Sequence, residues 1–315
     1  MSTNMKTAEF VSPRHPDKIC DQIADTLLDA YLVGDPGSRV AVEVMGGHGK
    51  ISVSGEVTSG ANVDIQKIVH DIVGNDYEVN IYLTKQSPAI AHGVDTGGAG
   101  DQGIMIGYAT RETKNFMPLE YELARKLCGE IYEKYPCDGK TQVTVDGDKV
   151  RTVVASFQNT KTGDLEKLVR ELIAADEYLV NPAGEWTMGG FDADSGLSGR
   201  KIVVDNYGPE VGIGGGSFSG KDYTKVDRSG AYMARHIAVD YLRKNPAVNI
   251  VRVKLAYAIG KKDPVMAVAE LDGQETPIRG YDLTPAGIRT SLGLDKVRWA
   301  DTAAWGHFGR AFSWN

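Results

Sequence analysis

The stretch VAVEVMGGHGKISVSGEVT, residues 40–58, decides the fold because it holds two extended segments joined by a tight turn. Its valines alternate with other residues over 40–45, which is typical of a strand with one buried face. Glycines at 46, 47 and 49 allow the chain to turn, and a second strand follows over 51–58. This segment therefore predicts a β-hairpin.

Amphipathic helices are predicted on both sides of the hairpin. Residues 16–33 precede it with apolar side chains every four residues, a proline at the first position and a glycine after the last. Residues 63–73 form the second helix, and a further strand is predicted over 79–83. The order is thus helix, strand pair, helix.

The same order of elements returns twice along the chain. In the second unit, the predicted helices and strands cover residues 119–131, 142–145, 150–157 and 165–175. In the third unit, they cover 229–243, 250–259, 265–271 and 285–292. We therefore predict an α+β protein of three similar domains, each a mostly antiparallel sheet covered by helices on one face, because the strands are joined as hairpins before and after helices and not in βαβ alternation. The domains are expected over residues 1–97, 98–189 and 190–315, with strands free to exchange between them.

The charge balance limits the classes of partner. The chain has 35 Lys and Arg against 42 Asp and Glu, a formal net charge of −7, which argues against a general nucleic-acid-binding protein. No window approaches the roughly 20 apolar residues of a membrane span, and the first residues lack the apolar core of a signal peptide. We therefore expect no nucleic-acid or membrane partner and a cytoplasmic protein.

A glycine-rich run at residues 98–103, GAGDQG, satisfies the dinucleotide-binding pattern GxGxxG. It follows a loop and precedes the strand-like residues 104–108, the reverse of the Rossmann order, so we reject a Rossmann site. Asp101 is poorly suited to pyrophosphate, but its carboxylate can accept hydrogen bonds from a ribose hydroxyl or a substrate ammonium. On the motif alone, a tight structural turn is the simpler explanation.

A second run, GGGSFSGKD at residues 214–222, is one residue away from a P-loop. Asp222 stands where Ser or Thr would hold magnesium, so the P-loop mechanism fails. The backbone N–H groups and hydroxyls of the run still suit phosphate oxygens. The nearby cations form the predicted polyphosphate cluster: Arg200, Lys201, Lys221 and Lys225. A solvated surface loop is the alternative.

The residues HPDKI, 15–19, open the first helix. Unpaired N–H groups and the positive end of the helix dipole attract anions there, and His15 and Lys18 add donors. Asp17 is either an ordinary first-turn acid or a ligand of magnesium, which commonly takes one or two carboxylates plus phosphate oxygens. Glu43 and Glu56 lie in predicted strands, where solvent-facing positions explain them.

Together these segments resemble the methionine adenosyltransferase family, also called S-adenosylmethionine synthetase, over nearly the whole chain. The glycine-rich blocks at residues 98–108 and 214–222 match both signature patterns of that family without a mismatch. Other matching stretches are HPDKI from His15, GEVT from Gly55, KQSP from Lys85 and GHFGR from Gly306.

The resemblance implies three domains about a pseudo-threefold axis and a homodimer with active sites between the subunits, with dimers pairing into tetramers left open. It implies that methionine sulfur attacks C5′ of ATP and expels triphosphate, which is then hydrolysed to phosphate and diphosphate. Two magnesium ions per active site and one potassium ion are also implied. Since a thioether needs no base, the site must align the reactants and stabilise a departing polyanion.

The resemblance also implies residue roles. His15 would donate to the oxygen that leaves C5′. The cations that would neutralise triphosphate are Lys18, Arg200, Lys201, Lys221 and Lys225. The ions would be held by Asp17 and Asp227 for magnesium and by Glu43 for potassium. Further ATP contacts would come from Asp138, Gly139, Lys140, Trp186, Asp194 and Ser217. Methionine would contact Glu56, Gln86, Asp101, Asp194 and Lys225.

The chain departs from the family pattern at a few positions. The loop between Gln86 and Gly98, which gates the site in the family, is several residues shorter. We therefore expect a more open methionine pocket that accepts bulkier S-alkyl homologues. Trp186 stands where phenylalanine is usual, and Glu185 stands beside it where a base is common.

Two other functions remain as alternatives. A tripolyphosphatase would hydrolyse phosphate without alkylation, but the methionine-binding positions of the family are present, which argues against it. A non-catalytic, ATP-binding regulatory homologue should lack the contacts to the leaving group, yet His15, Asp17 and Lys221 are present. We therefore expect a magnesium-dependent transferase.

Overall fold

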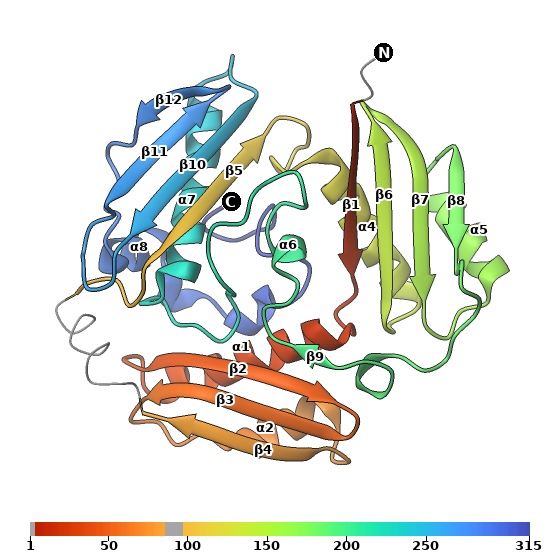
Figure 1. The fold of residues 1–315 in the computed structure, drawn as a ribbon, viewed down its shortest axis with the longest axis horizontal. Helices are drawn as coiled ribbons and strands as arrows, with labels where there is room; N and C mark the ends of the chain where they lie inside the picture. Colours follow the sequence, from red (N-terminus) through yellow and green to blue (C-terminus); the bar gives the residue numbers. More distant parts are fainter. Residues whose placement is uncertain (1–3, 86–96) are drawn as a thin grey trace.

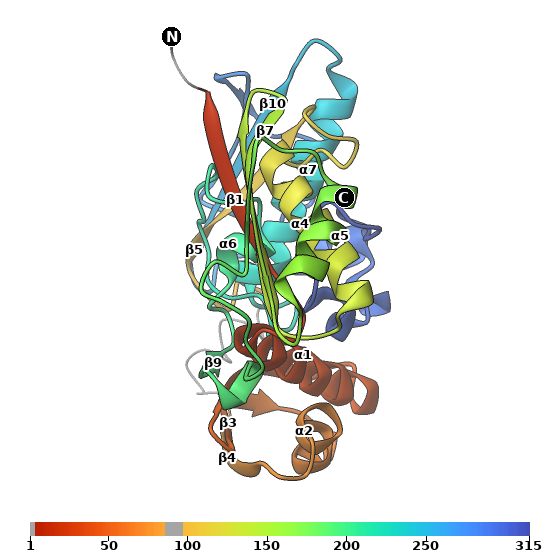
Figure 2. The ribbon, with the colours of Figure 1, turned by 90° about the vertical axis from the view of Figure 1, so that its right-hand side faces the viewer.

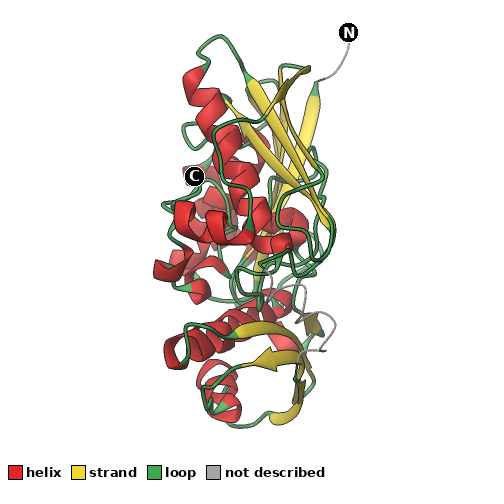
Figure 3. Cartoon of the chain, turned by 90° about the vertical axis from the view of Figure 1, so that its left-hand side faces the viewer, coloured by secondary structure: helices red, strands yellow, loops and turns green. Residues whose placement is uncertain are grey.

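The computed structural model describes residues 4–85 and 97–315, which form three four-stranded sheets around a common centre (Figure 1). Strands gather on one side of the molecule and helices on the other (Figures 2 and 3). The predicted α+β class is therefore confirmed. Gln86 and the shortened loop lie outside the described residues, so the predictions about them stay predictions.

The first sheet contains the predicted hairpin. Its strand order is β4–β3–β2–β9, with β2 at Arg39–Gly47, β3 at Lys50–Thr58, β4 at Glu78–Thr84 and β9 at Gly196–Leu197. Helices α1 (Pro16–Gly34) and α2 (Ile65–Val73) cover one face (Figure 1). The alternating valines of β2 are buried, as their spacing predicts.

The second sheet is formed mainly by the middle of the chain. Its order is β1–β6–β7–β8, with β1 at Met5–Val11, β6 at Gly139–Asp146, β7 at Lys149–Phe157 and β8 at Glu177–Val180. Helices α4 (Leu119–Lys134) and α5 (Thr162–Leu172) lie on one face.

The third sheet has the order β12–β11–β10–β5, with β5 at Gly103–Thr110, β10 at Ile250–Tyr257, β11 at Met266–Leu271 and β12 at Gln274–Pro277. Helices α7 (Val226–Lys244) and α8 (Pro285–Leu292) cover it. The remaining helical segments are short: α6 at Ile202–Asp205 and 3-10 turns at Gly190–Asp192, Leu294–Lys296 and Trp299–Thr302.

Each sheet takes one strand from another part of the chain. β1 begins the chain but pairs with β6, β5 follows the first unit but pairs with β10, and β9 returns to pair with β2. These exchanges tie the three units together. They also bring residues 196–201, which follow the second unit, to the beginning of α1.

Two strand pairs differ from the expected hairpin connections. β3 pairs with β4 in parallel, and so does β7 with β8. In each case a helix, α2 or α5, lies between the two strands in the sequence, and a helical crossover is the usual connection between parallel neighbours. The expectation that strands and helices do not form βαβ units is therefore wrong at these two places, although the sheets remain mostly antiparallel.

The sheet faces opposite the helices carry exposed apolar side chains. Met45 on β2, Ile104 on β5 and Met266 on β11 are 56, 47 and 39% exposed. Exposed apolar residues in such positions are typical of surfaces that another protein covers.

Within the ranges that the structure describes, no helix is long and apolar enough to cross a membrane.

Glu120, in the first turn of α4, is fully buried. Neither of its carboxylate oxygens has a hydrogen-bond partner among the described residues. Burial raises the pKa of Glu120, because a carboxylate in an apolar environment favours its neutral form. The folded protein therefore binds a proton here more tightly than the unfolded chain does.

The first prediction concerns Glu120→Gln. The folded-state pKa is raised, so the cost of Glu120 to stability is absent at low pH and grows as pH rises above the ordinary glutamate range. We expect the variant to be more stable than the wild type by about 1 kcal/mol at pH 8 and equally stable near pH 4. Urea unfolding at both pH values measures this, with Glu133→Gln, an exposed glutamate of the same helix, as control. A pH-independent difference would contradict the assignment.

Candidate active site

The first cationic centre lies where α1 begins. Asp17 is fully buried, and its Oδ1 accepts a hydrogen bond from the Leu197 N–H at 2.9 Å. Lys201 Nζ donates to Asp17 Oδ2 at 2.6 Å, and Arg200 Nε lies 3.3 Å from Oδ1. Burial disfavours the charge of Asp17, but the Lys201 ammonium and the Leu197 N–H hold its pKa below the usual value. The carboxylate therefore stays ionised and attracts cations.

His15 caps α1 beside this centre and is buried. Its Nδ1 accepts a hydrogen bond from the Asp17 N–H at 3.2 Å. Burial, together with the charges of Lys201 and Lys140, lowers the pKa of His15 to about 3. The ring is thus neutral at physiological pH, and because Nδ1 is the acceptor, the proton is on Nε2. His15 can donate a hydrogen bond from Nε2 without becoming charged.

A second cationic centre lies at the start of α7. Lys221 Nζ donates to Asp227 Oδ2 at 2.7 Å, and the Gly216 N–H donates to Asp227 Oδ1 at 3.2 Å. The two glycine-rich runs meet here, because the Gly100 N–H donates to the Thr224 carbonyl at 3.2 Å. A carboxylate, an ammonium and the Gly216 N–H are therefore brought together.

The loops of the two centres touch each other. A Cβ at Gly199 would lie 2.4 Å from the Cβ of Ser217, so the residues before Arg200 pack against the glycine-rich loop. The backbone of Lys221 also forms an isolated antiparallel β-bridge with Ala41 of β2. The cluster of cations predicted from the sequence thus draws on two neighbouring loops, both close to α1.

The predicted adenine-binding residues surround β6 and β7. Lys140 is the cross-strand neighbour of Ser156, and Trp186 Nε1 donates to Ser156 Oγ at 3.1 Å. The Trp186 ring and Lys140 therefore share one face of this sheet. Asp138 is buried, its Oδ2 accepts from the Gly190 N–H at 2.9 Å, and burial raises its pKa. Gly139 follows it as the first residue of β6.

Glu185, the neighbour of Trp186, is engaged elsewhere. Its Oε1 accepts from the Thr162 N–H at 3.0 Å, and its Oε2 accepts from Lys161 Nζ at 2.8 Å. These contacts hold the start of α5, where helix N–H groups lack partners within the helix. Glu185 therefore has a structural role at a position where a basic residue is common in the family that the sequence resembles.

The predicted methionine and potassium ligands are more exposed. Glu43 and Glu56 lie on the face of the first sheet opposite α1, where Glu43 pairs in register with Ser54. The carboxylate of Asp101 accepts from the Gln102 N–H at 2.7 Å, and that of Asp194 accepts from the Ser195 N–H at 2.8 Å. Asp194 lies near His15, whose pKa its charge tends to raise.

Two of the predicted cations have carboxylate partners in the interior. Lys18 Nζ lies 2.5 Å from Asp205 Oδ1 and 2.9 Å from Asp21 Oδ2, and its side chain is 2% exposed. Lys225 Nζ donates to Asp222 Oδ2 at 2.8 Å. The structure brings both residues close to the site but gives each ammonium a buried partner. Their contact with triphosphate stays a prediction.

The donor set fits magnesium only together with a phosphate ligand. Asp17 and Asp227 are single carboxylates, each beside a lysine. Across residues 4–85 and 97–315, no group of three or more His, Cys, Asp or Glu side chains is placed to hold a metal. Magnesium bound by one carboxylate plus phosphate oxygens needs no such group.

The residues behind the site were not predicted from the sequence. Arg228 and Asp25 form a fully buried pair, with Nη1 to Oδ1 at 2.7 Å and Nη2 to Oδ2 at 2.9 Å. Arg228 Nε also donates to the Tyr232 hydroxyl, which lies 2.8 Å from His307 Nδ1. One signal was available: Asp17, Asp21, Asp25 and Asp29 recur every four residues in the first helix.

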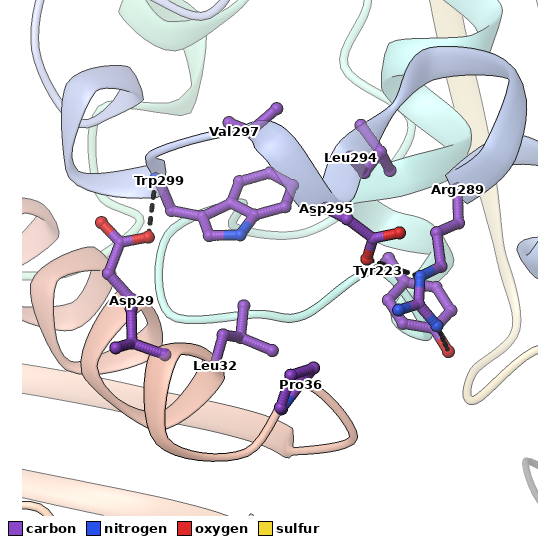
Figure 4. Close-up of a pocket in the computed structure, with 10 residues that line it drawn as sticks. Asp29, Leu32, Pro36, Tyr223, Arg289, Leu294, Asp295, Val297 and Trp299 are labelled. Carbon is purple, nitrogen blue, oxygen red and sulfur yellow. Dashed lines mark hydrogen bonds and ion pairs between the residues drawn. The ribbon is translucent and has the colours of Figure 1, made fainter.

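A cavity of about 380 Å³ lies at the opposite end of α1 (Figure 4). Asp29 of α1 accepts a hydrogen bond from the Trp299 N–H at its edge, and Arg289 is held by Asp295 and the Tyr223 hydroxyl. None of the predicted site residues is among the described residues that line this cavity. It is separate from the two cationic centres.

Models of the S-adenosylmethionine synthetase domains match almost the whole chain. The N-terminal domain model matches residues 3–94, the central domain model 96–186 and the C-terminal domain model 188–315. The chain is 41% identical to an S-adenosylmethionine synthase of Nocardia farcinica, covering 96% of this chain and 92% of the relative. It is 40% identical to the S-adenosylmethionine synthase of Mycoplasmopsis synoviae, covering 98% and 94%.

A solved structure also matches over nearly the full length. It is described as an unusual S-adenosylmethionine synthetase from Campylobacter jejuni, and it superposes with a TM-score of 0.89 at 33% identity, covering 98% of this chain and 96% of that one. The Nocardia alignment spans 374 positions against 315 residues here, so that relative contains residues without a counterpart in this chain.

The second prediction concerns Gly220→Ala. Gly220 has φ +78°, and a Cβ would lie 2.1 Å from the Val42 carbonyl oxygen. Gly147 has φ +60° with nothing within 4 Å of its Cβ position, so Gly147→Ala is a matched control for backbone strain alone. We expect a loss of about 1 kcal/mol for the control and about 3 kcal/mol or more for Gly220→Ala. Equal losses in urea unfolding would show that the close approach is unimportant.

Proposed function

The chain belongs to the S-adenosylmethionine synthetase family, and we propose that it makes S-adenosylmethionine from ATP and L-methionine. The observation that carries the proposal is the pair of ionic contacts, Lys201 with Asp17 and Lys221 with Asp227, on two touching loops beside neutral His15. Pairs of a partly exposed lysine with a buried carboxylate suit a polyphosphate that arrives with magnesium.

The reaction transfers the adenosyl group to sulfur. A lone pair on the methionine sulfur forms the new bond to C5′, while the bond between C5′ and the triphosphate oxygen breaks and its electron pair leaves with triphosphate. The sulfur carries no proton, so no base is required. The protein must therefore orient the two substrates and stabilise charge on the departing oxygen. His15 would do the latter by donating from Nε2.

The loop cations would neutralise the triphosphate. Arg200, Lys201 and Lys221 reach the surface, and each ammonium or guanidinium would turn from its carboxylate to phosphate oxygens. Two magnesium ions at Asp17 and Asp227 and one potassium ion at Glu43 would add positive charge there. Water then cleaves triphosphate to phosphate and diphosphate. Ser217 would donate its hydroxyl to the same anion.

The remaining ATP and methionine contacts follow from the placement of the side chains. Adenine would stack on Trp186 beside Lys140 and the Asp138–Gly139 backbone. The ammonium of methionine would meet Asp101, Glu56 or Asp194, all acceptors without a cation partner in the described contacts. Its carboxylate would meet Gln86 or Lys225.

We also propose that two copies of the chain associate. Glu43 and Glu56 lie on the open sheet face that also carries exposed Met45, and this apolar face would be covered by a second subunit. The active sites would then lie between subunits. Light scattering distinguishes a dimer from a tetramer and from a monomer, which would contradict the proposal.

The third prediction is the outcome of the direct assay. The protein is incubated with ATP, L-methionine, magnesium and potassium, and the products are resolved by mass. We expect S-adenosylmethionine, phosphate and diphosphate. A tripolyphosphatase would release phosphate and diphosphate from added triphosphate without forming the sulfonium, and a regulatory homologue would form no product. Either of these results would overturn the proposed function.

The fourth prediction concerns Trp186. Stacking of a base on an aromatic ring is worth about 1–3 kcal/mol, so Trp186→Ala is expected to raise the KM for ATP about 10-fold. Trp186→Phe keeps a ring but loses the hydrogen bond to Ser156, and we expect its KM to stay within about 3-fold of the wild type. The KM for methionine serves as the internal control. If the alanine and phenylalanine variants behave alike, the ring does not stack on adenine.

A further inference from the structure

Helix α1 carries a row of four aspartates, Asp17, Asp21, Asp25 and Asp29. Residues four apart lie on one face of a helix. The first three are fully buried and Asp29 is half-buried. Buried carboxylates destabilise a protein unless hydrogen bonds compensate for lost water, so the partners of the row matter.

Every aspartate of the row accepts hydrogen bonds from the backbone of a distant segment. Asp17 accepts from the Leu197 N–H at 2.9 Å and Asp21 from the Gly199 N–H at 2.9 Å. Asp25 accepts from the Gly220 N–H at 2.8 Å. Asp29 accepts from the N–H groups of Trp299 and Ala300 at 2.8 and 2.9 Å (Figure 4). One helix face thus holds three separate segments.

Two of these segments carry the loop cations. Gly199, held by Asp21, directly precedes Arg200 and Lys201. Gly220, held by Asp25, directly precedes Lys221. The segment held by Asp29 contains none of the cations assigned to triphosphate. The same kind of contact therefore occurs with and without a cation beside it.

Asp25 holds the backbone on both sides of Lys221. It accepts from the Gly220 N–H directly, and its partner Arg228 donates from Nη1 to the Lys221 carbonyl at 3.2 Å. Arg228 and Asp25 are both fully buried. Since a misplacement of about 1 Å can cost about 100-fold in rate, fixing this backbone matters for a residue that must meet a charged leaving group.

We propose that Asp21 and Asp25 are positioning residues for the triphosphate-binding cations, with Asp21 setting Arg200 and Lys201 and Asp25 setting Lys221. The proposal rests on the proposed function for the identity of the anion. Both carboxylates are enclosed by protein, so neither can touch the anion, and each reaches the cations of its loop through the backbone N–H that it accepts from.

The test compares Asp21→Ala, Asp21→Asn and Asp29→Ala. The amide oxygen of Asn can still accept from the Gly199 N–H, while Ala cannot. Lys18 keeps Asp205 as a partner in both Asp21 variants, so the ammonium is not left unpaired. Asp29→Ala removes two backbone contacts from the same row and is the matched control. Binding of diimidotriphosphate, an analogue that resists hydrolysis, is measured by calorimetry with magnesium, alongside thermal unfolding, kcat and KM.

We expect Asp21→Ala to weaken analogue binding and to lower kcat, each by about 10- to 100-fold, with the KM for methionine nearly unchanged. Asp21→Asn should bind within about 3-fold of the wild type. Asp29→Ala should melt at a lower temperature but bind the analogue normally. If Asp21→Ala does not fold, Asp21→Ser replaces it, because the shorter hydroxyl cannot reach Gly199.

The role of Asp25 is tested with the double variant Asp25→Asn with Arg228→Met. Removing Asp25 alone would leave Arg228 buried without its carboxylate partner. The double variant keeps an acceptor for Gly220 but loses the contact to the Lys221 carbonyl, and we expect about 10-fold weaker analogue binding.

Unchanged analogue affinity in Asp21→Ala, or an equal loss in Asp29→Ala, overturns the inference whatever product the wild type makes. If the wild type forms no S-adenosylmethionine but Asp21→Ala still loses analogue binding, the proposed function fails and the positioning role stands.

Discussion

The fold depends on the hydrogen bonds that the buried aspartates of α1 accept. A carboxylate without water must find protein donors, and here those donors are backbone N–H groups about 180 to 270 residues away along the chain. The two loops that carry the cations are rich in glycine, which loses more conformational entropy on ordering than any other residue. Charged acceptors at fixed positions on a rigid helix offset that loss. The strand exchange through β9 begins in one of the segments so held.

The ionic contacts around the site are of two kinds. Lys18 is 2% exposed and lies between Asp21 and Asp205, and burial raises the pKa of Asp205 to about 7, so this cluster carries little net charge. By contrast, the side chains of Lys201 and Lys221 are 16 and 18% exposed, each against one carboxylate. The buried contacts are permanent parts of the fold. The partly exposed ammonium groups can turn to phosphate oxygens, provided that a cation that arrives with the phosphate takes their place at Asp17 and Asp227, because a buried carboxylate left without a partner is costly.

Local patterns in the sequence were sufficient for most elements but not for their pairing. The helix predicted over 16–33 spans Pro16–Gly34, and the short helix predicted over 285–292 is found at those bounds. Strand exchange depends on contacts between residues more than 100 positions apart in the sequence. The spacing of apolar residues within one segment gives no information about such contacts. In the site, the motifs indicated His15, Asp17 and the loop lysines, which the structure places close together and whose roles stay predictions. They did not identify Asp25 or His307. For Asp25 the reason is that an acidic residue every four positions is also typical of the solvent-exposed face of a helix. In the folded protein, the loops that pack on α1 bury this face.

The same constraint accounts for the position of the glycines and for an acidic protein that is expected to bind a polyanion. Gly220 must bring its N–H to Asp25 with φ +78° while its Cα passes close to the Val42 carbonyl, which no side chain permits. On the other loop, a Cβ at Gly199 would lie 2.4 Å from the Cβ of Ser217. The acids that hold these glycines lie behind the loops and are neutralised there by Arg228 and Lys18 or by backbone dipoles. The net charge of −7 is therefore a poor guide to the field at the site, since several of its negative charges serve to orient the cations that face outward.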